Sequence, residues 1–166
     1  LGNVTFGATP KNIVVYTSMP NGVADTANLD DTLKVSKGAS LAGVYTVGGA
    51  TPDFPDVVSA ANAINQFGVC GPVVFNIRPG TYNQGQVALG NIVGASAVNT
   101  VTFQSENGNK NTTTITNAGN TIALQGTKYV RIKNLTITSS AAAYVFTMGA
   151  DVAHDSIVGC DIIQPI

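Results

Sequence analysis

Charged residues are scarce in this sequence. They make up only 10% of its 166 residues, with eight Lys and Arg against nine Asp and Glu and a formal net charge of -1, whereas about 25% is usual. Eight thinly scattered cations cannot neutralise a phosphate backbone, which argues against a nucleic-acid binder. Disordered chains combine high charge with low hydrophobicity. Because 44% of these residues are hydrophobic, the sequence predicts a folded domain.

Other absences narrow the fold class further. The chain has one Glu, no Trp and no apolar run of membrane-spanning length, and a spanning helix needs about 18 or more such residues. Coiled coils and helical bundles, which are rich in Ala, Leu, Glu and Lys, are excluded as well. The two cysteines, Cys70 and Cys160, are too few for a disulfide scaffold and lack paired metal-ligand spacing. We expect both to be small buried side chains.

Small and β-branched polar residues are abundant instead. The sequence has 19 Thr, 16 Asn and 18 Gly. Thr is favoured on the exposed face of a strand, while Gly and Asn are favoured in turns. This composition predicts an all-β fold whose solvent face consists of Thr, Asn, Ser and Gln.

The chain divides into three parts by pattern. Residues 1–40 form an irregular leader with a strand at 12–17 and a turn at 20–22, and residues 41–71 contain a strand at 41–49 and a capping helix at 53–68. In that helix Asp53 can act as N-cap, Pro55 and Asp56 suit the first turn, and Gly68 ends it. We expect its buried face to contain Val57, Ala61, Ile64 and Phe67.

Residues 72–166 consist of short alternating runs separated by turn residues. They lie at 73–77, 100–104, 113–116, 121–124, 129–132, 134–138, 144–148 and 156–163. Apolar residues recur at a nearly fixed offset. Ile132, Leu135 and Ile137 recur 25 residues later as Ile157, Cys160 and Ile162; Ile122 and Leu124 recur 24 later as Phe146 and Met148; Phe75 and Ile77 recur 26 later as Val101 and Phe103. This divides the segment into about four coils of roughly 24 residues.

A fixed offset favours one architecture. A sandwich of hairpins has no reason to repeat at a constant interval, whereas a parallel β-helix stacks each coil on the previous one. We therefore predict a solenoid of about four coils, with the helix at 53–68 covering its first coil. The expected outward positions are Thr102, Gln104, Thr114, Thr116, Arg131, Thr136 and Thr138.

Several segments resemble a known bacterial module. They are GVYTVGG at 43–49, PDF at 52–54, ANAIN at 61–65, GVCGPVVFNIRPGTYN at 68–83, GAS at 94–96 and TVTFQS at 100–105. The module resembles the pectin-lyase-like right-handed parallel β-helix with an N-terminal capping helix, found in large surface and secreted proteins exported through the type IX route. The resemblance covers about residues 41–140. It implies a multidomain parent and an extracellular or cell-surface location, and it leaves activity open.

The two ends of the sequence fit that expectation. The chain begins at Leu1 and ends at Ile166, directly after a strand-like run. No residues at the C-terminal end resemble a cap, although open strand edges need protection. We expect the chain to be part of a longer protein, with the β-helix coils of residues 72–166 truncated.

Acidic residues are too dispersed to predict a catalytic site. Pectin-lyase-like enzymes hold Ca²⁺ with clustered Asp or use paired carboxylates. Here Asp151, His154, Asp155 and Asp161 alone gather in one coil. Asp151 and Asp155 are candidates for a metal or acid–base site, against the plainer interpretation of a solvated loop. Asp161 aligns with Thr136 and should face solvent, and Arg78 is expected to anchor a turn.

Asp-Ser/Thr-apolar triplets supply a separate hypothesis. They occur at Asp25, Asp31 and Asp155, and bacteria resembling the suspected source O-glycosylate such triplets. The resemblance therefore implies Thr26, Thr32 and Ser156 as O-glycosylation candidates. A glycan there would be bulky, solubilising and exposed.

The sequence predicts a non-catalytic β-helix module of a large exported surface protein, with a stalk or adhesive role. No cofactor is expected, and the expected partners are other domains of the same chain, neighbouring copies or a polysaccharide. One alternative is a fragment of a lyase or hydrolase acting on acidic polysaccharide. Another is a carbohydrate-binding module that uses Tyr82, Tyr129 or Tyr144 as stacking platforms.

Overall fold

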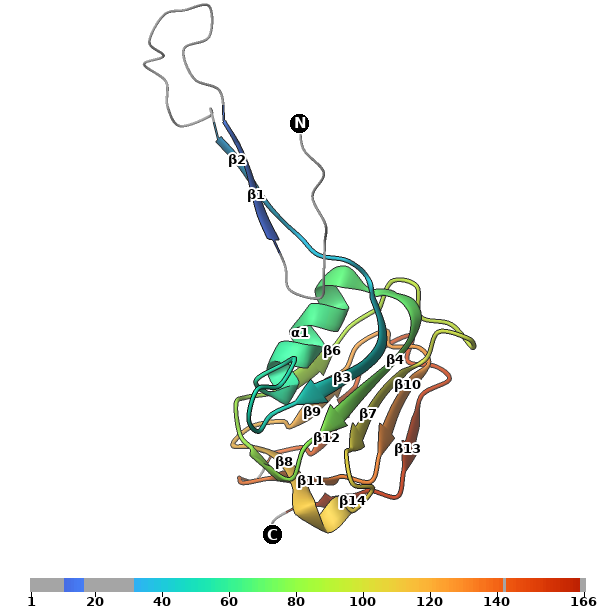
Figure 1. Ribbon diagram of the computed structural model, residues 1–166. Coiled ribbons are helices and arrows are strands. Elements are labelled where there is room, and N and C mark those ends of the chain that lie inside the picture. The colour runs from blue at the N-terminus through green and yellow to red at the C-terminus, as the bar shows by residue number, and fades with distance from the viewer. Residues whose placement is uncertain (1–10, 17–31, 142, 165–166) are drawn as a thin grey trace, which may run out of the picture. The chain divides into compact units, whose positions relative to one another are not determined.

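The computed structural model describes residues 11–16, 32–141 and 143–164 (Figure 1). The chain separates into two compact units, Leu1–Ser40 and Leu41–Ile166. The predicted turn at 20–22 and the candidate Thr26 lie outside the described residues. Each unit is described by itself below.

The first unit contains a two-stranded antiparallel ribbon. Strand β1 (Lys11–Tyr16) pairs with β2 (Thr32–Lys37), with Ile13 opposite Val35 and Val15 opposite Leu33. The strand predicted at 12–17 is confirmed for residues 12–16, and Thr17 lies outside the described residues. Since successive side chains alternate between faces, these four apolar residues share one face of the ribbon. Val15 is 56% exposed and Leu33 62% exposed.

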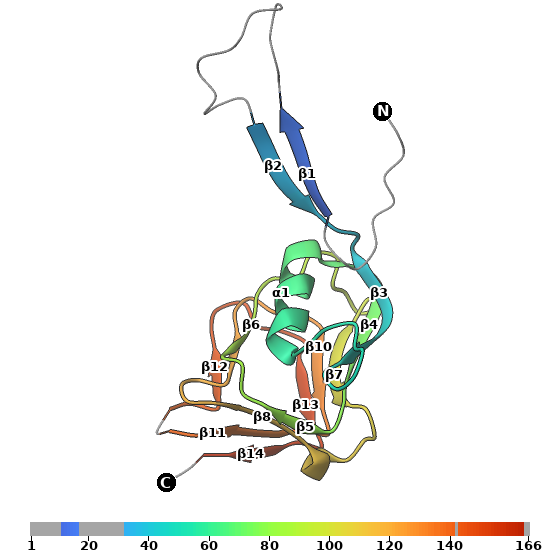
Figure 2. The same cartoon turned by 60° about the vertical axis from the view of Figure 1, so that its left-hand side comes forward.

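The second unit consists of short strands that form three parallel sheets (Figures 1 and 2). The strands are β3 (Leu41–Val47), β4 (Val69–Ile77), β5 (Gly80–Tyr82), β6 (Val87–Leu89), β7 (Val101–Ser105), β8 (Thr113–Asn117), β9 (Ile122–Leu124), β10 (Val130–Lys133), β11 (Thr136–Ser139), β12 (Phe146–Met148), β13 (Ser156–Val158) and β14 (Asp161–Ile163). A 3₁₀ turn, η2 (Lys110–Thr112), precedes β8. The predicted β-rich fold is confirmed.

The chain visits the three sheets in rotation. The sheet orders are β13-β10-β7-β4-β3, β14-β11-β8-β5 and β12-β9-β6. Each strand from β7 onward therefore lies beside the strand three places earlier in the sequence. Because parallel neighbours cannot be joined by a tight hairpin, the intervening chain must pass through the other two sheets.

The pairing register confirms most of the predicted offsets. Ile132 pairs with Ile157, Ile137 with Ile162, and Leu124 with Met148. The offset of 26 residues predicted for Phe75 and Ile77 is wrong. Phe75 pairs with Phe103 and Ile77 with Ser105, two residues further along. Side-chain direction has a period of two, so a shift of two residues leaves the buried and exposed pattern almost unchanged.

Three strands are absent from the predicted set. One is β2, which lies in the leader that was expected to be irregular apart from the strand at 12–17. The other two are β5 and β6. Strands β5 and β6 contain three residues each and lie among Gly, Asn and Gln. Segments this short offer too few residues for alternation to stand out from a loop. Their neighbours β8 and β9 define them, through the pairs Tyr82–Ile115 and Leu89–Leu124.

Helix α1 (Val57–Phe67) is shorter than the predicted 53–68, and its N-cap differs from the prediction. Asp56 is the N-cap, because its Oδ1 accepts from the Ser59 N–H at 2.7 Å. Asp53, the predicted cap, instead binds Thr46 on β3. Asp56 lies three residues closer to the helix than Asp53, and no sequence pattern indicated that Thr46 of β3 would bind Asp53. Gly68 ends the helix as predicted, with φ +64.

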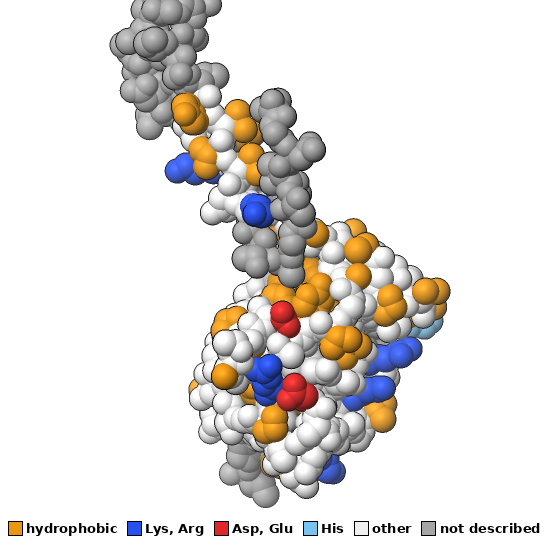
Figure 3. All heavy atoms as spheres, viewed as in Figure 1, with side chains coloured by type: hydrophobic (Ala, Val, Ile, Leu, Met, Phe, Trp, Pro, Cys, Tyr) orange, Lys and Arg blue, Asp and Glu red, His pale blue; other side chains and the backbone are white. Residues whose placement is uncertain are grey.

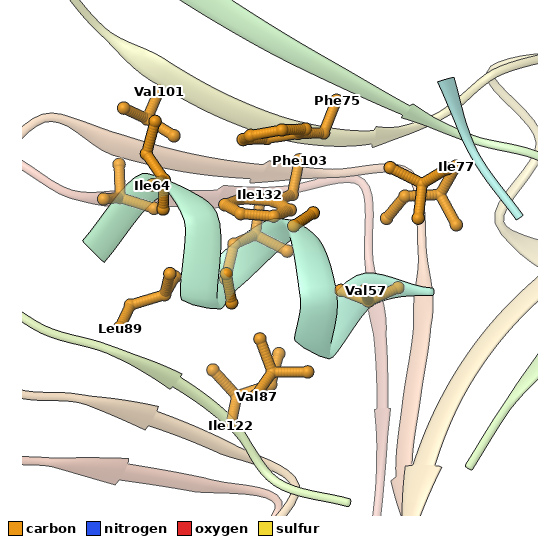
Figure 4. Close-up of a cluster of buried hydrophobic side chains, with 14 of the residues drawn as sticks. Val57, Ile64, Phe75, Ile77, Val87, Leu89, Val101, Phe103, Ile122 and Ile132 are labelled. Atoms are coloured by element: carbon orange, nitrogen blue, oxygen red, sulfur yellow. The ribbon is translucent and has the colours of Figure 1, made fainter. Parts of the chain in front are cut away.

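The core fills the space between α1 and the three sheets. Figure 4 shows Val57 and Ile64 of α1 among side chains from β4, β7 and β10 of one sheet and from β6 and β9 of another. Ile115 and Ile137 of the third sheet belong to the same buried cluster. The Phe75 and Phe103 rings stack with centroids 4.7 Å apart. Phe67, predicted on the buried face of α1, is only partly buried, whereas Ala60 and Ala63 are buried. The helix thus buries small side chains that let it approach the sheets closely.

Most predicted outward positions carry polar side chains that are at least partly exposed, and Thr102 is the exception. Thr102 is buried, with 6% of its surface exposed.

The two cysteines also differ from the prediction that both are buried. Cys70 is exposed, and Cys160 is intermediate. Cys70 occupies an outward position of β4, whose burial alternates from Val69 onward. A small apolar residue type does not reveal which face it occupies.

Candidate functional site

The carboxylate of Asp155 joins two successive turns of the chain. Its Oδ2 accepts from the Thr127 hydroxyl at 2.5 Å and its Oδ1 from the Val130 N–H at 2.8 Å. Thr127 is completely buried. Hydrogen bonds to a charged acceptor are stronger than those between neutral groups. Asp155 therefore holds the last part of the chain against the segment that enters β10.

Asp151, the other metal candidate, is exposed in a turn with φ +59. In the part of the chain that the structure describes, no group of three or more His, Cys, Asp and Glu residues could hold a metal ion. Ca²⁺ needs six to eight oxygen ligands. Asp151 and Asp155 do not bring further carboxylates with them, so the described residues supply no such ligand set.

His154 lies against an aromatic ring from an earlier turn. The His154 and Tyr129 rings are 4.9 Å apart and nearly parallel, at 9°. Both residues have positive φ, +60 and +62, which non-glycine residues rarely adopt. Their turns are linked by a parallel bridge between Lys128 and Ala153. The stack joins two turns that repeat at the 25-residue offset.

Asp161 pairs with Thr136 in register, as predicted, and it has a cationic partner. The Lys110 Nζ lies 2.5 Å from its Oδ1, with the two side chains about 40% exposed. The Lys110 carbonyl also accepts from the Thr136 hydroxyl at 3.0 Å. A partly exposed pair of this kind contributes about 0–1 kcal/mol to stability. The acid predicted to face solvent is thus paired with a residue that lies 51 positions earlier in the chain.

Arg78 anchors a turn, but it is the turn after β3 and not the one that follows at Pro79 and Gly80, where the sequence placed its role. Its Nη1 donates to the carbonyls of Gly48, at 3.2 Å, and Ala50, and its Nε lies 3.6 Å from Glu106. The guanidinium therefore joins a turn, a strand end and a loop. Each of its contacts is structural.

Tyr82 is unavailable as a sugar-stacking platform because it is only 7% exposed. Its hydroxyl donates to the carbonyls of Val47, at 3.2 Å, and Arg78, at 2.9 Å. Burial raises the pKa of this phenol above its usual range. Gly48 packs against the ring, and a Cβ there would lie 2.1 Å from the Tyr82 hydroxyl. Tyr144, by contrast, is 72% exposed.

Asp53 fastens the segment before α1 to β3. Its Oδ2 accepts from the Thr46 N–H at 2.7 Å and the Thr46 hydroxyl at 2.8 Å. The bond from the Thr46 backbone is the main cause of a lowered pKa for this carboxyl. Hydrogen bonds to the charged form favour ionisation. This anion therefore has a structural explanation.

Cys160 lacks the lowered pKa of an activated nucleophile. Burial raises the pKa of the Cys160 thiol, whereas a nucleophilic thiolate needs a lowered one.

Of the glycosylation candidates, Thr32 is exposed on β2 and Ser156 is partly buried on β13. O-glycosylation of Thr32 and Ser156 stays a prediction.

The strands β12, β13 and β14 form what we call the end face, because each is the last strand of its sheet. Ile162 is 52% exposed, although its register partner Ile137 is fully buried. Met148 is 62% exposed, whereas its partner Leu124 is 2% exposed. Sequence reasoning identified these as core positions and found no cap at the C-terminal end, which agrees with their exposure here.

Comparisons with known proteins give no relative for this chain. No protein-family description, curated protein or solved structure matches it. Among the described residues, no helix has both the length and the hydropathy needed to cross a lipid bilayer. The functional interpretation therefore rests on the residues and their geometry.

Proposed function

We propose that the unit Leu41–Ile166 is a right-handed parallel β-helix that serves as a non-catalytic module of a large exported surface protein, in a stalk or adhesive role. The rotation of the chain through three parallel sheets supports this architecture. So do the apolar columns, such as Ile115, Ile137 and Ile162, that continue from coil to coil. In a solenoid each repeat contacts mainly its neighbours, which suits an extended spacer.

The observation that carries the proposal is the use made of the polar side chains. Asp155 binds Thr127, Lys110 binds Asp161, and the Gln104 Nε2 donates to the Asn76 Oδ1 at 2.9 Å. The Asp155–Thr127 and Gln104–Asn76 bonds join successive coils, and the Lys110–Asp161 pair spans two coils. Enzymes that cleave polysaccharides need paired carboxylates or a metal with a base, held in a cleft. The described carboxylates instead bind residues of neighbouring segments or lie alone on the surface.

The outer surface agrees with a structural role. In Figure 3 the charged side chains form small separate groups on a surface dominated by uncharged polar and apolar atoms. An acidic polysaccharide would be attracted by a continuous cationic field. Only eight Lys and Arg are available in the chain, and two of them, Arg78 and Lys110, have acidic partners.

The resemblance of residues 41–140 to the pectin-lyase-like modules supports the extracellular setting of the proposal. The module's most specific block, 68–83, contains Arg78 and Tyr82. These two residues lock the first coils together through carbonyl contacts. The block therefore supplies contacts that hold the fold together, and a stalk and an enzyme with this fold would both need such contacts.

The test is to incubate the chain with acidic and neutral polysaccharides, with and without Ca²⁺. Ultraviolet absorbance would detect unsaturated products and a reducing-end assay would detect hydrolysis. We expect neither. Turnover that persists in the purified chain would overturn the proposal, and an Asp155→Asn variant would show whether the candidate acid is responsible.

A carbohydrate-binding role is favoured by one observation, the exposed ring of Tyr144. Aromatic faces of this kind stack on sugar rings. Calorimetry with the same polysaccharides distinguishes the two roles: binding without turnover, lost in Tyr144→Ala, would favour recognition. Val98→Ala is the matched control, since Val98 is 77% exposed and not aromatic.

Intact-mass measurement on the protein from its native host tests glycosylation of Thr26, Thr32 and Ser156.

A further inference from the structure

Three cations of the second unit lie close together in the sequence without an acidic partner. The unit holds five Lys and Arg, and two of them, Arg78 and Lys110, pair with acids. The others, Lys128, Arg131 and Lys133, fall within six residues in and just before β10. Among the described residues they form no ion pair or hydrogen bond through their side chains. Like charges this close repel one another, so the fold itself gains nothing from gathering them.

Two of these cations stand in rows that are otherwise uncharged. Arg131 lies between Thr102 and Ser156 in register, and Lys133 lies beside Gln104. Burial alternates along β10, and both cations project from its outer face. Residues of one face follow each other at about 7 Å along a strand. Both side chains can therefore reach the same small ligand.

The third cation borders the stacked rings of Tyr129 and His154. Lys128 and Ala153 form a parallel bridge, so the turn that carries His154 lies beside the turn before β10. His154 is exposed, and its ring makes no hydrogen bond to the described residues. A neutral imidazole keeps one N–H donor. The positive φ of both ring-bearing residues is the kind of backbone strain that concentrates at functional sites.

We call Lys128, Arg131, Lys133 and the His154 ring the β10 patch. The acid next to it in the sequence, Asp155, is engaged elsewhere, because its two oxygens accept hydrogen bonds from residues on the chain before β10 and at its start. In Figure 3 Lys and Arg side chains gather at the right-hand edge over β10, beside the His side chain, with no Asp or Glu side chain among them. The positive charge of the patch is thus left for a group from outside the chain.

We propose that the β10 patch binds the phosphate group of an external ligand. A phosphate monoester carries about −1.5 to −2 charges at pH 7 and three strong acceptor oxygens, whereas a carboxylate offers a single charge. The guanidinium of Arg131 can donate two parallel hydrogen bonds to a phosphate, while Lys128 and Lys133 act as point charges. Three cations are too few for a long polyanion and suit one compact, multiply charged group. The inference adds a ligand chemistry to the proposed adhesive role and does not depend on the absence of catalysis.

A nuclear magnetic resonance titration of the isotope-labelled chain detects such a contact. At constant ionic strength, inorganic phosphate and glucose 6-phosphate should shift the amides of residues 128–133 and of His154, with dissociation constants in the millimolar range. Glucuronate, which carries one charge, should bind about fivefold more weakly or less. Tighter binding of glucose 6-phosphate than of inorganic phosphate would identify a phosphorylated sugar as the source. Co-sedimentation with phosphatidic acid vesicles, compared with phosphatidylcholine vesicles, would identify a lipid headgroup.

Charge-removing variants locate the binding. Arg131→Gln and Lys133→Gln should each weaken phosphate binding by about fivefold or more. Lys110→Gln is the matched control, because it also removes one partly exposed cation, but one that is paired with Asp161. Circular dichroism verifies that each variant is folded, and the two patch variants replace outward side chains of the same strand.

Two results would overturn the proposal. The first is the absence of amide shifts in the patch at about 20 mM phosphate, well above the expected dissociation constant. The second is an equal loss of binding in Lys110→Gln, which would show attraction to the net charge of the chain rather than to the patch. Tight binding of glucuronate would likewise contradict a preference for phosphate. Polysaccharide turnover would contradict the proposed function without affecting these results.

Discussion

The two ends of the second unit present the same kinds of residue under opposite conditions. At the α1 end, Leu41, Val47 and Ile64 are at most 1% exposed. At the end face, Met148, Ile162 and Ile163 are between 50% and 62% exposed. Both sets lie in strands or a helix at the boundary of one stack. The difference lies in what covers them, a helix at one end and solvent at the other.

This comparison shows that the burial of an inward position depends on the strands beside it in the sheet. Ile137 and Ile162 are the same residue type and pair in register, yet only Ile137 has a neighbouring strand on both sides. A buried aliphatic side chain contributes about 1.5–3 kcal/mol relative to an exposed one. The stability of the unit should therefore be unevenly distributed, with most of it near α1 and little at the end face.

The largest contrast is expected between two truncations of core columns. Phe75→Ala removes a fully buried ring that contacts Phe54 and Phe103, and should lower the free energy of unfolding by about 3–5 kcal/mol. Met148→Ala should cost under about 1 kcal/mol, because most of that side chain is already in water. Urea unfolding monitored by circular dichroism measures both, and equal losses would refute the comparison.

Asp155 tests how firmly the last coil is attached. Asp155→Ala leaves the buried Thr127 hydroxyl and the Val130 N–H without their acceptor, which should cost about 2 kcal/mol. Exchange of the β13 and β14 amides should accelerate more than exchange of the β3 and β4 amides. Asp151→Ala is the control, since no hydrogen bond to its carboxylate is found among the described residues. Uniform acceleration throughout the unit would mean that the last coil does not open separately.

The helix cap gives a smaller effect at the closed end. Asp56→Ala removes the acceptor for the Ser59 N–H and should cost about 1 kcal/mol. If Asp53 were the cap, as the sequence alone predicted, Asp53→Ala would instead be the variant that frays the start of α1. Exchange rates of the first α1 amides in the two variants distinguish these assignments.

The smallest effect is a dependence on pH at the same end. The pKa of Asp53 is lowered in the folded chain by the bonds from Thr46, so its contribution to stability is present above the unfolded pKa of about 3.9 and is lost as pH falls through the folded value. Asp53→Asn should therefore be slightly less stable than wild type at pH 7, with the gap closing below about pH 4. Thermal melts at both pH values measure this. A gap that is unchanged in acid would show that the ionised form gives no advantage.

Alternation and offset predicted much of the fold. The offsets of 24 and 25 residues placed Ile157, Ile162 and Met148 in the correct register, because inward columns must repeat once per coil. The offset for Phe75 was wrong by two residues, since period-two alternation does not distinguish the two alignments. Strands β5 and β6 were missed because three residues carry no pattern of their own.

The candidate site was harder to predict than the fold. The sequence gathered Asp151, His154, Asp155 and Asp161 into one coil, but their partners Thr127, Tyr129 and Lys110 are 25 to 51 residues away. No spacing rule links a carboxylate to a hydroxyl one coil earlier. The role of Gly68 could be predicted because it acts at the end of its own helix. The turn that Arg78 anchors lies 28 to 30 residues earlier in the chain, at Gly48 and Ala50, and the sequence did not identify it.

By itself the sequence determined the β-rich fold, the columns of apolar residues and the position of α1, because alternation and helix-stop signals act over a few residues. Only the tertiary structure decided which acids bind residues of neighbouring strands and loops, and which cysteine is exposed. Those properties depend on which side chains meet across the coils. The exposure of Ile162 beside the buried Ile137 shows that a residue's type fixes its tendency to be buried, and its neighbours fix the outcome.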